Sequence, residues 1–149
     1  MDLNIYNIHF IVGVGLFGVP KSVEYLANIQ RDVDTSGILL LDYGDFKVLS
    51  IAAKDSGAPV TSTIEGENET IVVNGPANVM DSFDIYHNSE KLQHIDKKVY
   101  PHRMFEEFKE FNRMIEKHDM SKCKKMLNHS DEVMQVLQKA VESAGLKLE

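Results

Sequence analysis

Three side chains near the beginning of the chain have types and spacings that could do chemistry. Asp2, Tyr6 and His9 follow one another at intervals of four and three residues, so on a helix they share one face. The Asp2 carboxylate can there orient the Tyr6 phenol or hold a substrate hydroxyl. An unperturbed tyrosine has a pKa of about 10, so Tyr6 needs a neighbouring cation to exchange protons at neutral pH.

The same residues also have purely structural interpretations. Asp2 is a good N-cap for a helix, and Tyr6 is an ordinary residue of an amphipathic helix. A lone histidine such as His9 is more often half-buried packing than a ligand. Spacing alone leaves both interpretations open.

The stretch that contains these side chains can fold in two ways. In one, residues 5–12 form a buried strand, and Gly13, Gly15 and Gly18 form a G-x-G-x-x-G loop of a Rossmann-like nucleotide-binding domain. In the other, Asp2 begins a helix that runs to residue 17 and ends at Gly18 before Pro20. Glycines inside a helix cost about 1 kcal/mol each relative to alanine. A helix that nevertheless contains them usually packs closely against another backbone, a subunit or a ligand.

The rest of the chain favours the helix. Alternating or β-branched runs separated by short polar turns predict about six or seven strands, at residues 22–29, 37–43, 46–53, 60–65, 70–73, 83–87 and 91–95. A Rossmann domain would need helical crossovers between its strands, and these turns are too short to hold them. From Tyr100 the apolar period becomes helical, which predicts one helix to about Lys117 and another from Ser121 to Ala144, closed by Gly145.

We therefore predict a single α+β domain over residues 1–149. Its open, mainly antiparallel sheet of about six strands carries the N-terminal helix and two C-terminal helices on one face.

Composition excludes several classes of function. The 149 residues carry a formal net charge of −7, which disfavours a nucleic-acid partner. The single cysteine, Cys123, cannot form an internal disulfide, so a cytoplasmic location is expected. No apolar run approaches the length of a membrane span, and the histidines show no metal-ligand spacing, so neither a membrane nor a metal is expected.

Several short motifs, in their order along the whole chain, resemble one family. They are MDLNIY at residues 1–6, LFGVP at 16–20, DVDT at 32–35, DYG at 42–44, AKDS at 53–56 and IEGE at 64–67. With the closing helices, they resemble the C-terminal domain of the Gfo/Idh/MocA oxidoreductases, in the branch that includes dimeric dihydrodiol dehydrogenase. Asp2 and Tyr6 match the D-x-x-x-Y of that branch, whereas Asn4 stands where the branch usually has glycine.

The resemblance implies a function. Tyr6 would exchange the hydroxyl proton of a sugar, polyol or cyclic diol, Asp2 would hold the substrate or the tyrosine, and His9 would line the pocket. NAD or NADP and a catalytic lysine would come from an N-terminal Rossmann domain that is missing from this chain. The chain alone would then bind no cofactor and be inactive, and it would form a homodimer through its sheet. The Rossmann-like nucleotide binder and a non-catalytic dimerisation or partner-binding module stay as alternatives.

Overall fold

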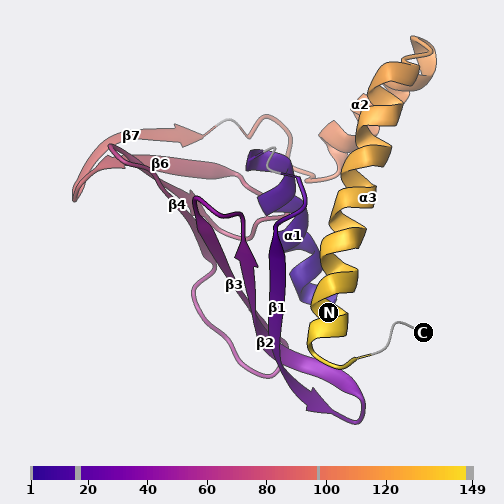
Figure 1. Ribbon diagram of the computed structural model, residues 1–149. Coiled ribbons are helices and arrows are strands. Elements are labelled where there is room, and N and C mark those ends of the chain that lie inside the picture. The colour runs from indigo at the N-terminus through magenta and orange to yellow at the C-terminus, as the bar shows by residue number, and fades with distance from the viewer. Residues whose placement is uncertain (1, 16–17, 97, 147–149) are drawn as a thin grey trace. The chain divides into compact units, whose positions relative to one another are not determined.

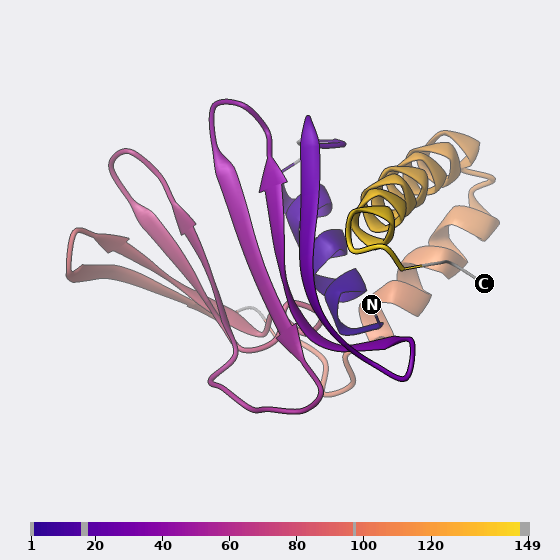
Figure 2. The same ribbon diagram turned by 60° about the horizontal axis from the view of Figure 1, so that its bottom comes forward.

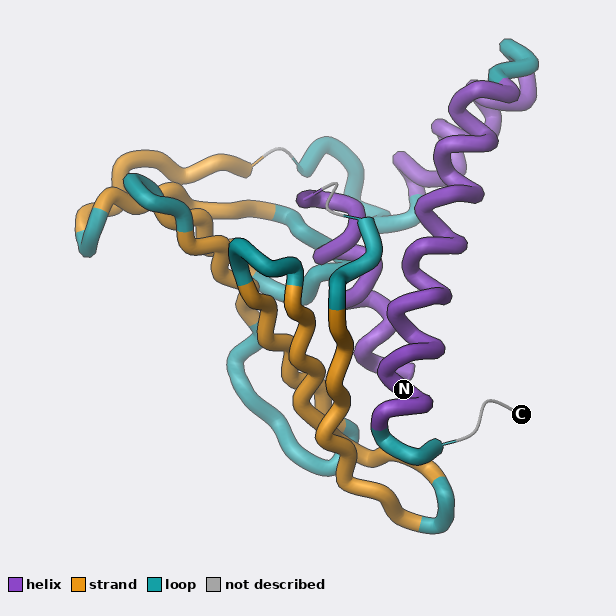
Figure 3. The backbone as a smooth tube through the Cα atoms, viewed as in Figure 1, coloured by secondary structure: helices purple, strands orange, loops and turns teal. Residues whose placement is uncertain are grey.

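The computed structural model describes residues 2–15, 18–96 and 98–146. The chain divides into two compact units, one made of residues 1–57 and 123–149 and the other of residues 58–122. Figure 3 shows the distribution of helices, strands and loops along the backbone. In the part of the chain that is described, no helix is both long and apolar enough to cross a membrane.

The first unit contains helix α1 (Asp2–Gly15) and strands β1 (Ser22–Gln30), β2 (Val33–Asp42) and β3 (Lys47–Ala53). The strands form an antiparallel sheet in the order β1-β2-β3. Most of helix α3 (Met120–Ser143) belongs to the same unit. Helices α1 and α3 lie on the same side of this sheet (Figures 1 and 2).

The hairpin between β1 and β2 is tighter than the polar run from Gln30 to Ser36 predicted. Gln30 already pairs with Val33, and only Arg31 and Asp32 form the loop. Both have positive φ, 52° and 63°, which is typical of the two-residue turns that match the twist of a hairpin. Because the loop is this short, Asp34 lies inside β2.

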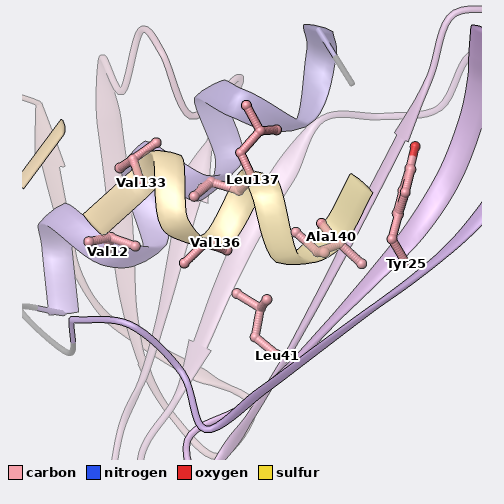
Figure 4. Packing of buried hydrophobic residues seen from close by; sticks show 9 residues of the cluster. Val12, Tyr25, Leu41, Val133, Val136, Leu137 and Ala140 are labelled. Atoms are coloured by element: carbon pink, nitrogen blue, oxygen red, sulfur yellow. The ribbon is translucent and has the colours of Figure 1, made fainter. Parts of the chain in front are cut away.

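The core of the first unit forms where α3 packs on α1 and on the inner face of the sheet. Figure 4 shows Val12 of α1 and Leu41 of β2 around Val133, Val136 and Ala140 of α3. All five side chains are at most 1% exposed. The Gly145 φ of +69° fits the predicted C-terminal end of α3, and the helix runs without a break through His129.

The second unit contains strands β4 (Thr61–Glu65), β5 (Thr70–Asn74), β6 (Ser82–His87) and β7 (Glu90–Asp96), followed by helix α2 (Phe105–Glu116). The four strands form an antiparallel sheet in sequence order. Strands β6 and β7, both predicted, form a hairpin with Asn88 in its turn at a φ of 52°. None of the residues of α2, which is described throughout, is fully buried.

The α+β class, the N-terminal helix and the two C-terminal helices are confirmed, whereas the sheet differs from the prediction in one respect. The strands form two sheets, of three and four strands, instead of one open sheet. β3 and β4 are separated by residues 54–60, which include Gly57 and Pro59, and the hydrogen-bonded ladder does not continue through them. Proline lacks the N–H that a ladder needs.

The Rossmann-like interpretation of the glycines is wrong. Residues 5–12 are helical, and Gly13 and Gly15 lie inside the same helix, α1. A dinucleotide cradle needs these glycines in a loop before a helix, so they cannot form one here. The predicted end of this helix at residue 17 falls outside the described residues, but Gly18 has a φ of +66°, as expected at a break.

Candidate functional site

Helix α1 presents two faces with different roles. Asn4, Ile8 and Val12 point into the first unit and are at most 1% exposed, whereas Tyr6 is 48% exposed. Asp2 begins the helix four residues before Tyr6, which places both residues on one face. The side chain of Asp2 is not among those described, so the predicted contact between carboxylate and phenol stays a prediction.

A buried polar network fastens the start of α1 to strand β3. The Ser50 hydroxyl donates to Asn4 Oδ1 at 3.1 Å, and Asn7 Nδ2 donates to the Ser50 oxygen at 2.9 Å. Asn4 is 1% and Ser50 7% exposed, and buried polar groups with their partners in place fix a unique geometry. Asn4, which lies between Asp2 and Tyr6 in sequence, therefore fixes the position of α1 relative to β3.

A second polar contact lies under the sheet edge near α1. The Tyr25 hydroxyl donates to Asp34 Oδ2 at 2.8 Å, and its backbone N–H donates to the Ser143 hydroxyl at 2.9 Å. Burial, and then the hydrogen bond to Asp34, raises the pKa of Tyr25 to about 12. Tyr25 therefore keeps its proton at neutral pH and acts as a hydrogen-bond donor, whereas Tyr6 is exposed to solvent.

The motif residues DVDT and AKDS meet at this place. Asp34, Thr35 and Lys54 line a cavity of about 10 Å³ together with Asn4 and Tyr25, a volume close to that of one water molecule. In the sequence these two motifs served only to mark a family resemblance. In the structure they lie around Asn4, which the buried polar network ties to β3. A larger open groove of about 560 Å³ between β1, β2 and the end of α3 has neither Tyr6 nor His9 in its lining.

His9 follows Tyr6 by three residues on α1, as its spacing required, but its contact with a residue of α3 was not predicted. His9 Nδ1 is 3.0 Å from Nε2 of His129 on α3. A Cβ on Gly13 would lie 3.2 Å from His129 Cε1, so Gly13 leaves room for this ring. The expectation that a helical glycine serves a close approach is thereby confirmed for Gly13.

The second unit holds a charged cluster that the sequence analysis missed. Asp84 on β6 has a 7% exposed side chain and accepts hydrogen bonds from Lys91 at 2.9 Å and His94 at 2.5 Å, both on β7. The bond from Lys91, and then that from His94, lowers the pKa of Asp84 to about 2. Strand pairing brings Asp84 opposite His94. The predicted strands at 83–87 and 91–95, paired as a hairpin, could have revealed this contact from the sequence.

The described residues hold no cluster of three histidine, cysteine, aspartate or glutamate side chains around a common point. Among the described residues of the first unit, the groups that could do chemistry include the exposed Tyr6, the histidine pair and the buried polar network beneath α1.

Comparison with known proteins finds relatives that are oxidoreductases by name. The chain is 38% identical over 74 residues to the uncharacterized oxidoreductase YgjR of Escherichia coli, covering 49% of this chain and 22% of that protein. It is 26% identical over 149 residues to scyllo-inositol 2-dehydrogenase (NADP(+)) IolU of Bacillus subtilis, covering 98% of this chain and 44% of that protein. No family model matches the chain.

Solved structures share the fold. The chain superposes on the provisionally named oxidoreductase yvaA of Bacillus subtilis with a TM-score of 0.63 at 15% identity, covering 99% of this chain and 52% of that one. A second provisionally named oxidoreductase, from Klebsiella pneumoniae, superposes with a TM-score of 0.60 at 20% identity, covering 95% of this chain and 48% of that one. The chain thus spans about half the length of these structures and less than half of the curated relatives. The two curated relatives support the resemblance to the Gfo/Idh/MocA oxidoreductases that the sequence motifs carry, and the solved structures share the fold.

Proposed function

We infer that this chain is the substrate-binding and dimerisation part of an NAD(P)-dependent oxidoreductase that acts on a sugar, polyol or cyclic diol. The observation that carries the proposal is the exposed Tyr6, one turn after Asp2, on a helix that the buried Asn4 anchors to β3. The relative that aligns along nearly the whole chain is named as an NADP-dependent dehydrogenase of scyllo-inositol, a cyclic polyol.

The proposed chemistry divides between two parts of the enzyme. The nicotinamide would supply hydride transfer, but the residues of this chain do not fit a dinucleotide, because Gly13 and Gly15 lie inside α1. This chain supplies the group that accepts the proton released by the substrate. As the substrate alcohol is oxidised, Tyr6 in its deprotonated, phenolate form takes the proton of the substrate hydroxyl, and Asp2 holds that hydroxyl in place. A lysine of the nucleotide-binding part lowers the pKa of Tyr6 toward the working pH.

The proposal is tested by joining the chain to a nucleotide-binding domain. The chain is fused behind the nucleotide-binding half of the Bacillus subtilis inositol dehydrogenase, and NADP⁺ reduction by scyllo-inositol is measured. The change Tyr6→Phe should lower kcat by roughly 10²- to 10⁴-fold, the range of general acid–base catalysis. The control Tyr100→Phe, in the second unit, should leave kcat unchanged. If Tyr6→Phe has no effect on an active fusion, the chain is a non-catalytic module.

Cofactor binding is tested on the chain alone. Calorimetric titration with NADP⁺ and NAD⁺ should give no heat of binding, because no dinucleotide cradle exists in the described part of the first unit. Micromolar binding would contradict the division of labour proposed here.

The dimer interface would be the outer face of the three-stranded sheet. Register aligns Leu26 with Ile38 and Ile38 with Ile51, and next to them Leu40 with Leu49. These side chains are between 36% and 64% exposed. A contiguous apolar surface of this kind marks an interaction site, and two copies of one face make a closed two-fold dimer.

Sedimentation tests the dimer. The wild-type chain should sediment as a dimer, and Ile51→Glu should convert it to a monomer, because each interface would receive two buried charges. Val60→Glu, at a 58% exposed side chain of the second unit, is the matched control. A monomeric wild type would contradict this part of the proposal.

We also place the enzyme in the cytoplasm, since its one cysteine, Cys123, has no internal partner for a disulfide.

A further inference from the structure

The histidine pair of the first unit takes no part in the proton transfer proposed for Tyr6, although the resemblance implies that His9 would line the same pocket. His9 lies on α1 and His129 on α3, 120 positions apart in sequence, and both rings are half-buried. The ring planes are tilted by 49° with centroids 5.1 Å apart, so the rings are not stacked. The close contact is between two nitrogen atoms, Nδ1 of His9 and Nε2 of His129, at 3.0 Å.

Both nitrogens can present lone pairs to a cation. Neutral imidazole is the form that binds metal ions. Without a cation, one ring must donate its N–H to the other across the 3.0 Å gap.

The separation of the nitrogens selects a coordination geometry. Two metal–nitrogen bonds of about 2.05 Å that meet at a right angle place their nitrogens about 2.9 Å apart, whereas a tetrahedral angle places them about 3.4 Å apart. The observed 3.0 Å fits the right angle. Right angles belong to square-planar and octahedral ions with nitrogen ligands, namely Cu²⁺ and Ni²⁺.

We propose that His9 Nδ1 and His129 Nε2 form a two-point site for a divalent transition-metal ion of the Cu²⁺ or Ni²⁺ class, which ties α1 to α3. Water fills the other coordination positions, since no third histidine, cysteine, aspartate or glutamate of the described residues completes a cluster with the pair. A bound ion replaces the hydrogen bond between the rings and leaves both helices where they are.

Metal binding at this place acts on the fold of the first unit. The two rings come from the opposite ends of the chain, and both helices contribute to the same core. An ion that binds only the folded arrangement stabilises it by mass action, by a factor of about 100 in the folding equilibrium at 100 times its dissociation constant.

The test uses the full chain without any affinity tag of histidines. Calorimetry with NiCl₂ should show one site, and both His9→Gln and His129→Gln should weaken it at least tenfold, a loss of the size reported for perturbing metal-site shells. His118→Asn is the matched control, because this histidine is exposed at a φ of 51°, which asparagine tolerates. It should bind Ni²⁺ like the wild type, and MgCl₂ should give no binding at all. Undiminished Ni²⁺ binding by either glutamine variant, or equal binding of Mg²⁺, would overturn the proposal.

A second measurement needs no variant and so does not depend on how the variants fold. One equivalent of Cu²⁺ is added to the wild-type chain, and electron paramagnetic resonance counts the imidazole nitrogens bound to it. Two equivalent imidazoles support the site. One or none overturns it.

Discussion

A single methyl group at Gly37 should destabilise the first unit by displacing a buried tyrosine. A Cβ built on Gly37 would lie 2.5 Å from Cε2 and 2.6 Å from the hydroxyl oxygen of Tyr25. Real Cβ atoms do not approach other atoms this closely, so in Gly37→Ala the ring must move. It cannot move freely, because Tyr25 is 3% exposed and donates to Asp34 at 2.8 Å.

The magnitude follows from these two constraints. Overpacking a filled core costs about 1–3 kcal/mol, and a weakened hydrogen bond to a charged acceptor costs about 1–2 kcal/mol more. A total of about 2–5 kcal/mol lowers the Tm of a chain of this size by about 5–20 °C. Thermal unfolding followed by circular dichroism measures the shift.

The chain offers a matched control and a rescue. A Cβ on Gly57 meets no atom within 4 Å, so Gly57→Ala should leave the Tm unchanged or raise it slightly through the unfolded state. In the background Tyr25→Leu, whose side chain does not extend to the Gly37 position, Gly37→Ala should cost much less than in the wild type. Equal stability of Gly37→Ala and the wild type would refute the packing described here.

Three further predictions concern the polar groups. The folded pKa of Asp84, about 2, lies below the ordinary value of 3.8, so its ionisation stabilises the fold above pH 4 and this contribution is lost as the pH falls from about 4 toward 2; Asp84→Asn should flatten acid unfolding curves in that window. Replacing Asn4 by alanine leaves the buried hydroxyl of Ser50 without its acceptor and should cost about 1–3 kcal/mol in urea unfolding, whereas a loss near zero would show that the anchor is not needed. The folded pKa of Tyr25 is raised to about 12, so its contribution to stability is complete below pH 10 and is lost as the pH rises through 12; ultraviolet titration should show a late-titrating tyrosine that Tyr25→Phe removes.

Local patterns predicted the elements well. The strands and the two C-terminal helices lie within a few residues of the predicted ranges, because alternation and helical period are properties of short stretches. The glycine-rich stretch was ambiguous by itself, and only the short turns downstream favoured a helix over a strand. The end residues were less certain: Asp119 caps the last helix, since Lys122 N–H donates to its carboxylate at 3.0 Å, although Ser121 was expected there.

The contacts within the candidate site were not predictable in the same way. Asp2, Tyr6 and His9 were found by spacing on one helix, which is local information. The partner of His9 is 120 positions away, and neither residue type nor period indicates which of the other histidines it meets. The division into two sheets escaped prediction for the same reason, since pairing between distant strands is decided by the whole chain.

The first unit is discontinuous in sequence, and this has a consequence during synthesis. Its helix α1 and its three strands leave the ribosome early, but Val133, Val136 and Ala140 of α3, which fill its core, are made only after residues 58–122. Until then Leu39 and Leu41 have no cover from α3. The nascent chain therefore carries a sheet face without its cover from α3 while residues 58–122 are made, and the second unit, which is continuous, can fold first. Such an intermediate is a natural client for chaperones that bind exposed apolar strands.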